Sequence, residues 1–402
     1  MSGPAAGTAA AAATTDVVCL GESMVTFLPS QPGRLADVPS FGRGIGGAES
    51  NVACALAAAG HRAAWVGRVG ADGFGDHLVE TIASYGVDTS AVRRDPDRPT
   101  GIYFRTAADR GTGTHEVAYY RAGSAASAMS PETVPHEDLF AGRVLHLSGI
   151  TAALSADCLA LLREATAPRP GRPLVSFDVN HRPHLWRGSA ADASVLLELA
   201  RRADLVFVGE DEAEEAWGIA GAEAIRAALP EPSVVVVKRG SAGATVFSRS
   251  GAGPMEAGGA ASRTGSGTDT GTGSGTGTGT DTGSGTSTGT GSGTGTETGT
   301  GTDTVTPVPA LRVDVVAAVG AGDAFAAGFL SATLRGLPVR DRARHGHLMA
   351  AAVLTVPGDL TEPPARDHAD RLVALDDDAW GRLRLAPGWT AAGRAPEEVR
   401  TP

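Results

Sequence analysis

A four-residue run, Gly320-Ala321-Gly322-Asp323, has the residue types needed to move a phosphoryl group. Glycines let the backbone turn sharply and bring bare N–H groups close to an anion. The small apolar run that follows predicts a buried helix starting at or near Asp323, and a helix start presents unpaired N–H groups and a partial positive charge. Asp323 would then take the proton of an attacking hydroxyl. Taken alone, the run fits a plain helix-capping aspartate better.

Three further polar stretches follow predicted strands, and each also has an ordinary structural explanation. Residues 238–244 (KRGSAGA) combine cations with a glycine turn, which fits a nucleotide site or a simple hairpin. Residues 210–212 (EDE) open a helix, where carboxylates favour the dipole or could hold water on Mg²⁺. Residues 178–183 (DVNHRP) form a loop in which Asn180 and Arg182 suit phosphate or a polar substrate.

Two short aromatic runs, residues 100–105 and 117–121, predict a hairpin that projects from the main sheet. Tyr103, Tyr119 and Arg121 on this hairpin could serve packing only, but an arginine between aromatic rings could equally bind a carboxylate. The ten histidines show no metal-ligand spacing, and His146 on a buried strand is typical of a core residue.

The rest of the chain alternates apolar strands with helices, which predicts a parallel sheet covered on both faces. We expect helices over these ranges: 51–59 (capped by Ser50 or a neighbour), 75–85, 156–165, 190–202, 210–217, 323–335 and 339–356. We expect strands over these ranges: 17–20, 63–67, 144–148, 174–178, 205–208, 233–238, 243–248 and 311–316. The chain after Asp359 carries no clear pattern.

Composition narrows the function classes. The chain has 402 residues, 42% of them hydrophobic, and a net charge of -11, which argues against a broad nucleic-acid surface. Three widely spaced cysteines without metal spacing suggest a reduced, cytoplasmic protein. Residues 1–15 lack the features of a signal peptide and are expected to form a disordered tail, and no apolar run is long enough for a membrane span.

Residues 264–304 consist almost entirely of Gly, Thr and Ser with a few acidic residues. A segment with nothing apolar to bury cannot offset its own ordering entropy. We therefore expect a disordered insertion over about 250–306, between two strands of a domain that runs from 16 to 360. A glycosylated stalk, the alternative, conflicts with an intracellular protein. Residues 361–402 are expected to form a C-terminal tail.

Two signatures in the expected order, residues 46–53 (GGAESNVA) and 320–325 (GAGDAF), resemble those of the ribokinase-like (PfkB) sugar kinases. The resemblance covers roughly residues 16–360 apart from the insertion. It implies a Rossmann-like α/β/α sandwich with a small β-sheet lid, from about 22–45 and 98–122, closing over the sugar. It also implies an ATP-dependent kinase acting on a small sugar or sugar acid, with dimerisation through lid edges as a further expectation.

Within the family, residues 119–125, 147–150 and 177–183 look like the 2-keto-3-deoxygluconate kinase branch. That likeness implies Asp323 as base, with Gly320, Ala321 and Gly322 cradling the phosphoryl group. It places the substrate against these residues: Gly47, Asn51, Tyr103, Tyr119, Arg121, Arg182 and Asp359. It places ATP along Asn180, Lys238, Gly240 and Gly243, and it links Glu212 to Mg²⁺.

The sequence departs from the family pattern at two places. Ala317-Ala318 replace the Asp-Thr often found before the glycine turn, which puts the monovalent-cation site of some members in doubt. Gly209 replaces the asparagine of the Asn-x-x-Glu motif. A fructokinase or ribokinase, and a catalytically silent sugar sensor on the same fold, therefore remain alternatives. A nicotinamide dehydrogenase is disfavoured because no Gly-x-Gly-x-x-Gly follows Leu20.

Overall fold

The computed structural model of the chain describes residues 15–31, 33–106, 116–186, 192–249 and 303–393. Its centre is an eight-stranded sheet in the order β14-β13-β12-β11-β10-β9-β1-β4. Six neighbouring strands, from β12 to β4, run parallel, and β13 and β14 are antiparallel at one edge. The strands are β1 (Thr15–Leu20), β4 (Ala63–Val66), β9 (Gly142–Ser148), β10 (Leu174–Asp178), β11 (Leu205–Gly209), β12 (Val234–Lys238), β13 (Ala244–Arg249) and β14 (Asp303–Val308).

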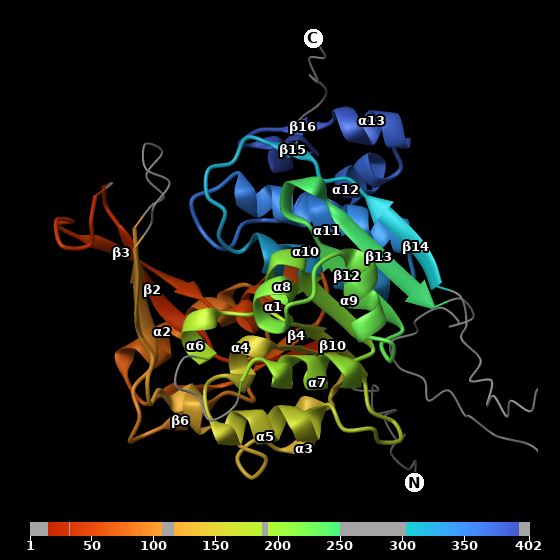
Figure 1. Cartoon of the computed structure of the whole chain (residues 1–402). Helices are drawn as coiled ribbons and strands as arrows, with labels where there is room; N and C mark the ends of the chain where they lie inside the picture. Colours follow the sequence, from red (N-terminus) through yellow and green to blue (C-terminus); the bar gives the residue numbers. More distant parts are fainter. Residues whose placement is uncertain (1–14, 32, 107–115, 187–191, 250–302, 394–402) are drawn as a thin grey trace, which may run out of the picture.

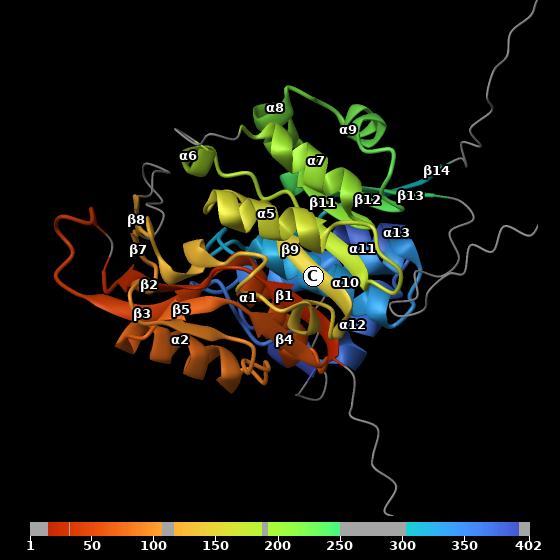
Figure 2. The ribbon, with the colours of Figure 1, turned by 90° about the horizontal axis from the view of Figure 1, so that it is seen from below.

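Each face of this sheet has its own core. Along β11, Leu205 and Phe207 pack on one face, whereas Val206 and Val208 pack on the other, as the two-residue period of a strand requires. The first face is covered by α1 (Ala48–Ala58), α2 (Gly73–Ser84), α10 (Ala321–Leu334) and α11 (Val339–Leu354). The second is covered by α5 (Ala156–Ala165), α7 (Ser194–Arg202), α8 (Glu210–Trp217) and α9 (Ala222–Ala228). Figure 2 shows these two helix layers, and the predicted α/β/α sandwich is confirmed.

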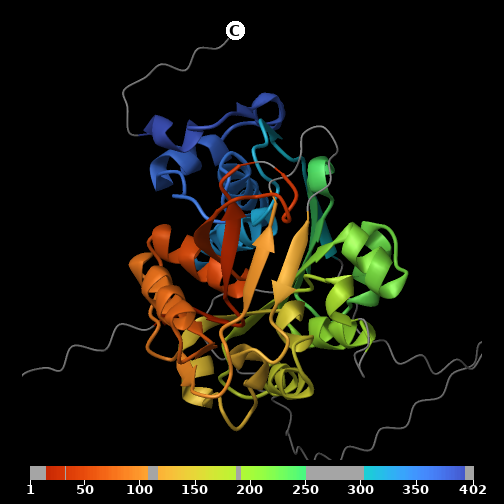
Figure 3. The same ribbon diagram turned by 90° about the vertical axis from the view of Figure 1, so that its left-hand side faces the viewer.

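A separate four-stranded sheet, which we call the lid, projects from one side of the body (Figures 1 and 3). Its order is β3-β2-β7-β8, and its strands are β2 (Met24–Pro29), β3 (Phe41–Gly46), β7 (Ile102–Arg105) and β8 (Val117–Tyr120). β7 and β8 pair antiparallel, so the predicted hairpin is confirmed. A further pair, β5 (Arg68–Gly70) and β6 (Arg93–Asp95), lies beside β4 and α2 in the chain.

Short elements complete the sandwich. They are the 3₁₀ turn η1 (Ala125–Ala128) and the helices α3 (His136–Leu139), α4 (Gly149–Ala152) and α6 (Pro183–Trp186). A further 3₁₀ turn, η2 (Gly240–Ala242), joins β12 to β13. No helix in the described part of the chain is long and apolar enough to cross a membrane.

The structure corrects three expectations about the elements. α1 begins at Ala48 with Gly47 as its N-cap, three residues before the predicted start and without a capping role for Ser50. The predicted strand 311–316 is wrong, because only β15 (Arg312–Val313) forms there. The edge strand is β14 instead, so residues 303–306 belong to the sheet and not to the predicted insertion.

The segment after residue 360 is folded over much of its length. It forms α12 (Arg366–Val373), α13 (Asp377–Arg382), β16 (Arg384–Leu385) and the turn η3 (Trp389–Gly393). Trp380 is fully buried and lies 4.5 Å from the Arg344 guanidinium of α11, and β16 pairs with β15. The expected tail is therefore partly a small subdomain against α11. The predicted N-terminal tail, up to residue 14, and residues 250–302 lie outside the described residues.

Candidate active site

Asp323 lies in the first turn of α10, directly after the glycine bend. Gly320 is the N-cap with φ 78°, a left-handed conformation that favours glycine, and no side chain caps this helix. The Asp323 carboxylate instead accepts a hydrogen bond of 2.9 Å from Nδ2 of Asn51 on α1. The helix thus begins two residues earlier than expected, and the interpretation of Asp323 as a plain N-cap is wrong.

The surroundings of Asp323 raise its pKa to about 7. Burial is the main cause, and the nearby Asp178 carboxylate adds to it, while the Asn51 hydrogen bond and the charges of Arg182 and Lys238 act in the opposite direction. A carboxylate with a pKa near neutrality is partly ionised at pH 7 and still basic enough to accept a proton. The pKa therefore suits a general base better than that of an ordinary surface aspartate.

Lys238 and Asp178 form a buried ion pair beside the bend. They end β12 and β10, and Nζ of Lys238 donates to both Asp178 oxygens at 3.1 and 3.0 Å. A Cβ added at Gly322 would lie 3.7 Å from this Nζ, so the ammonium group borders the turn. Burial alone would lower the pKa of Lys238, but the carboxylate of Asp178 and the nearby acids outweigh it and the pKa is raised. The lysine is therefore a permanent cation beside the N–H groups of α10.

The other residues expected at the nucleotide lie on turns at the same edge of the sheet. Asn180 follows β10 with φ 40°, an uncommon value for a residue with a side chain, and its buried Oδ1 has no partner among the described residues. Gly240 (φ 52°) and Gly243 (φ 107°) shape the turn between β12 and β13. A Cβ at Gly243 would lie 2.2 Å from the Val308 carbonyl oxygen, so only glycine fits there.

Glu212 has a structural role that does not exclude metal binding. Its Oε2 accepts a 3.0 Å hydrogen bond from the N–H of Gly209, which satisfies the start of α8, and Oε1 lies 3.6 Å from Arg182. No group of three potential metal-ligating side chains occurs in the described ranges. Mg²⁺ keeps several waters and binds through one or two carboxylates plus substrate phosphates. Glu212 at this edge fits that limited role.

The predicted sugar residues on α1 sit opposite Asp323. At Gly47, an added Cβ would lie 2.4 Å from the Glu22 carbonyl oxygen, so α1 starts in close contact with the segment after β1. Asn51, one turn later, reaches Asp323. Asn51, Ala324 and Asp359 also border one small hollow. The two signature segments thus meet at Asn51 and Asp323, which are 272 positions apart in the chain.

Tyr103 and Asp359 meet in a buried cluster that includes a residue the sequence analysis missed. The Tyr103 hydroxyl donates to Oδ2 of Asp359 at 3.2 Å, and Nη2 of Arg105 donates to Oδ1 at 2.5 Å. Burial raises the pKa of Asp359 despite the arginine. Arg105 lies two residues after Tyr103 on β7, on the same face of the lid, so the strand period could have revealed it.

Tyr119 and Arg121 flank the same face of the lid. The rings of Tyr103 and Tyr119 lie 5.4 Å apart, and Tyr119 stacks on His184 at 4.9 Å, which connects β8 with α6. The Arg121 guanidinium lies 5.9 Å from the Tyr119 ring centre and forms a buried ion pair with Glu22. Glu22 is not among the residues predicted for the site, although its place after β1 at the carboxyl edge of the sheet was a usable signal.

Arg182, another residue expected to bind the substrate, has an exposed side chain. Its side chain is 45% exposed, and Nη1 donates to the carbonyl oxygen of His181 at 3.0 Å. Its charge still acts on Asp323. The predicted residues therefore form two groups on either side of Asp323. We name them by the ligands expected there: the sugar end below the lid and the nucleotide end at the turns.

Comparisons with known proteins agree with this arrangement. The family model described as pfkB family carbohydrate kinase matches residues 14–267 and 290–366. The chain belongs to the pfkB family of carbohydrate kinases. It is 31% identical over 357 residues to 2-dehydro-3-deoxygluconokinase of Bacillus subtilis (strain 168), covering 88% of this chain and 93% of that protein. It is 31% identical over 237 residues to fructokinase-1 of Zea mays, covering 58% and 73%.

A solved structure supports the same conclusion for this pfkB kinase. The PfkB protein from Polaromonas sp. JS666 is 29% identical, with a TM-score of 0.64 over 89% of this chain and 99% of that one. The chain is thus an ATP-dependent sugar kinase with the ribokinase-like fold. The resemblance drawn from residues 46–53 and 320–325 is confirmed.

Proposed function

We propose that this kinase phosphorylates the terminal hydroxyl of a sugar acid, 2-keto-3-deoxygluconate, to give 2-keto-3-deoxy-6-phosphogluconate. The observation that carries the proposal is the position of Arg121. Its side chain is only 10% exposed beneath the lid, and its Nε has no hydrogen-bond partner among the described residues. A buried N–H group without a partner is costly, and a substrate carboxylate would satisfy it. The similarity to the Bacillus subtilis protein supports the same substrate.

Tyr103 and Tyr119 contribute the rest of the sugar site. Their rings, tilted by 32° to each other at 5.4 Å, form an apolar wall, and the cluster of Tyr103, Arg105 and Asp359 presents polar groups beside Asn51. Sugars bind well to surfaces that combine a flat apolar wall with a few placed polar groups. The open chain of a sugar acid would lie with its carboxylate at Arg121 and its terminal hydroxyl at Asp323.

The chemistry follows from the groups around Asp323. The carboxylate accepts the proton of the hydroxyl as oxygen attacks the γ-phosphorus, and the N–H groups of the 320–323 turn with Lys238 stabilise the transferring phosphoryl group. Mg²⁺, when bound with the nucleotide, supplies charge neutralisation across the phosphates, and Glu212 would hold its water ligands. The lid excludes water that would otherwise compete as acceptor.

The test is an ADP-release assay with Mg²⁺ and a panel of 2-keto-3-deoxygluconate, fructose and ribose, with mass analysis of the product. We expect the highest kcat/KM with the sugar acid and a phosphate on its terminal oxygen. A preference for fructose or ribose would overturn the proposed substrate but not the kinase activity. The absence of turnover with every sugar would indicate the silent sensor instead.

A fructokinase-type specificity is the second candidate, and two observations favour it. Glu22 and Asp359 offset the charges of Arg121 and Arg105, and the chain resembles a plant fructokinase. Arg121→Ala separates the candidates: it should raise KM for a sugar acid by roughly 100-fold, the loss of one charge-assisted contact of about 2–3 kcal/mol. Equal, small losses on acid and neutral sugars would favour the fructokinase.

A further inference from the structure

Glu22 is a buried carboxylate at the sugar end that takes no part in the proposed phosphoryl transfer. It follows β1 at the carboxyl edge of the sheet and is 2% exposed. Its Oε1 accepts a 2.5 Å hydrogen bond from the Ser124 hydroxyl, and its Oε2 pairs with Nη2 of Arg121. Both partners lie about a hundred residues further along the chain, just after β8. Glu22 therefore joins the core of the sandwich to the segment that leaves the lid.

The packing around Glu22 leaves room for this carboxylate. A Cβ at Gly101, just before β7, would lie 2.9 Å from Oε1, so a larger residue there would collide with it. A buried ion pair is a poor source of stability, because apolar residues of similar volume usually pack at least as well. Stability alone does not account for a charged residue at this place.

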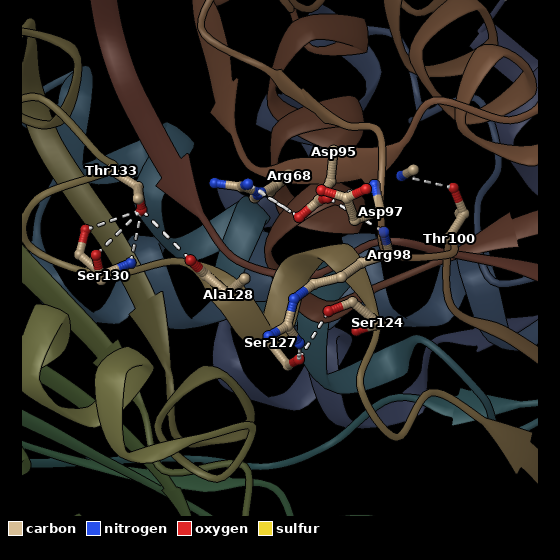
Figure 4. Close-up of polar contacts among 11 residues, drawn as sticks. Arg68, Asp95, Asp97, Arg98, Thr100, Ser124, Ser127, Ala128, Ser130 and Thr133 are labelled. Atoms are coloured by element: carbon tan, nitrogen blue, oxygen red, sulfur yellow. Dashed lines mark hydrogen bonds and ion pairs between the residues drawn. The ribbon is translucent and has the colours of Figure 1, made fainter.

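The segment that carries Ser124 contacts the backbone of Arg121, because the N–H of Ser124 donates to the Arg121 carbonyl oxygen at 3.0 Å. Two other contacts of the segment do not involve the Arg121 side chain. The N–H of Ala125 donates to the Pro99 carbonyl oxygen at 2.8 Å, and the Ser127 hydroxyl donates to the Ser124 carbonyl oxygen at 2.7 Å. Figure 4 shows Ser124 and Ser127 beside the loop that Asp95 closes by accepting from the N–H groups of Asp97 and Arg98. The Ser124 hydroxyl fixes the Glu22 carboxylate, and the carboxylate in turn orders the long side chain of Arg121.

We propose that Glu22 is a positioning and specificity-determining residue. It holds the Arg121 guanidinium where the substrate carboxylate is proposed to bind, with the Arg121 Nε–H left without another partner among the described residues. This inference rests on the proposed function.

The neighbouring carboxylate of Glu49 differs in its partners. It is fully buried and accepts hydrogen bonds from the hydroxyls of Ser148 and Thr151 at 2.8 and 2.7 Å, with no arginine at ion-pair distance among the described residues. Burial of a carboxylate in this region therefore does not in itself require an arginine. The charge of Arg121 also acts on Glu49, but Arg121 forms its close ion pair with Glu22.

The experiment compares Glu22→Gln with wild type on 2-keto-3-deoxygluconate and on fructose, with KM and kcat measured separately. Glutamine keeps the shape and removes the charge, so Arg121 loses its fixed geometry. We expect KM for the sugar acid to rise roughly 10- to 100-fold with kcat within about three-fold, and KM for fructose to change less than about three-fold. Ser124→Ala removes the hydrogen bond to the Glu22 carboxylate but keeps its charge, so KM for the sugar acid should rise by a smaller factor.

Asp303→Asn is the matched control. It removes a carboxylate paired with another buried arginine, Arg226, at 2.6 and 2.9 Å, on α9 and β14 away from the sugar end. We expect unchanged KM for both sugars in this variant. If Glu22→Gln fails to fold, as judged by circular dichroism and Tm, Ser124→Ala decides the question alone.

The outcomes separate the inference from the proposed function. If wild type phosphorylates the sugar acid and Glu22→Gln leaves its KM unchanged, or raises KM equally for both sugars, the inference is overturned and the function stands. If wild type does not phosphorylate the sugar acid, both are overturned. A selective rise in KM for the acid, absent in Asp303→Asn, supports both.

Discussion

The two ends of the active site are built in different ways. At the sugar end, two buried carboxylates, Glu22 and Asp359, each pair with an arginine that reaches from the lid. At the nucleotide end, the elements are local turns, and apolar side chains remain exposed beside the glycine bend: Val315 is 55% exposed and Val316 40%. The ion pairs of the sugar end thus join the lid to the core, whereas the ion pair of the nucleotide end, Lys238–Asp178, lies within the main sheet at an open edge.

This contrast assigns different tasks to the two ends. Open turns with fixed backbone geometry can admit a large nucleotide without rearrangement. Buried ion pairs between the lid and the core instead fix the distance at which a sugar fits, and they tie specificity to the lid position. Asp323 lies between the two ends. It accepts a hydrogen bond from Asn51 of α1 and is close enough to Lys238 for the charge of the lysine to affect its pKa. Mutations at each end should therefore affect different kinetic constants.

The largest effect on turnover is expected from a mutation of Asp323, which lies between the two ends. Asp323→Asn removes the base without changing its shape, so kcat should fall by roughly two to four orders of magnitude. Because only the proton acceptor is lost, Kd for sugar and for ATP, measured by calorimetry, should change little. Near-normal turnover would remove Asp323 from the mechanism, and lost binding at both ends would show that its role is structural.

The pH dependence sharpens the assignment of Asp323. Only the ionised carboxylate accepts a proton, so kcat/KM should rise with pH, pass through half of its plateau value near pH 7 and level off at higher pH. Asn51→Leu removes the hydrogen bond that lowers this pKa, so the rising limb should move to higher pH. Profiles of kcat/KM from pH 5 to 9 measure both. If the rise of kcat/KM in Asn51→Leu stays at the same pH or moves to lower pH, Asn51 does not lower the pKa of Asp323.

The sugar end should respond through KM and stability together. Asp359→Asn leaves Arg105 buried without its counter-charge, which destabilises a protein by about 3–5 kcal/mol where such a pair is fully buried. We expect a lower Tm and a KM for sugar raised more than that for ATP. Asp138→Asn breaks the exposed pair with Arg93 and serves as control, with almost no change. Equal rises in both KM values would contradict the division into two ends.

The difference between the two ends also explains which site residues could be predicted from the sequence. The nucleotide end consists of runs of adjacent residues, such as 238–244 and 320–323, so its chemistry was visible in the sequence. The ion pairs of the sugar end join residues separated by 99 positions (Glu22 and Arg121) or 254 (Arg105 and Asp359), and no local pattern specifies such partners. The edge strand β14 was missed because its Thr-rich sequence continues the composition of the preceding Gly/Thr run.

The smallest effect is expected from the Gly/Thr-rich segment, which in the chain joins β13 to β14 at the edge of the main sheet. The structure sets its boundary, because Asp303 and Thr304 pair with Arg249 and Ser248 of β13 and must be kept. Deletion of residues 264–300 should leave kcat, both KM values and Tm nearly unchanged, since loop length has only a weak effect on closure entropy. Deletion through 304 is the matched comparison and should lower Tm, because it removes two residues of the edge strand and the Arg226–Asp303 ion pair. A large change in KM from the shorter deletion would show that the segment contacts one end of the site, and the constant affected would identify which.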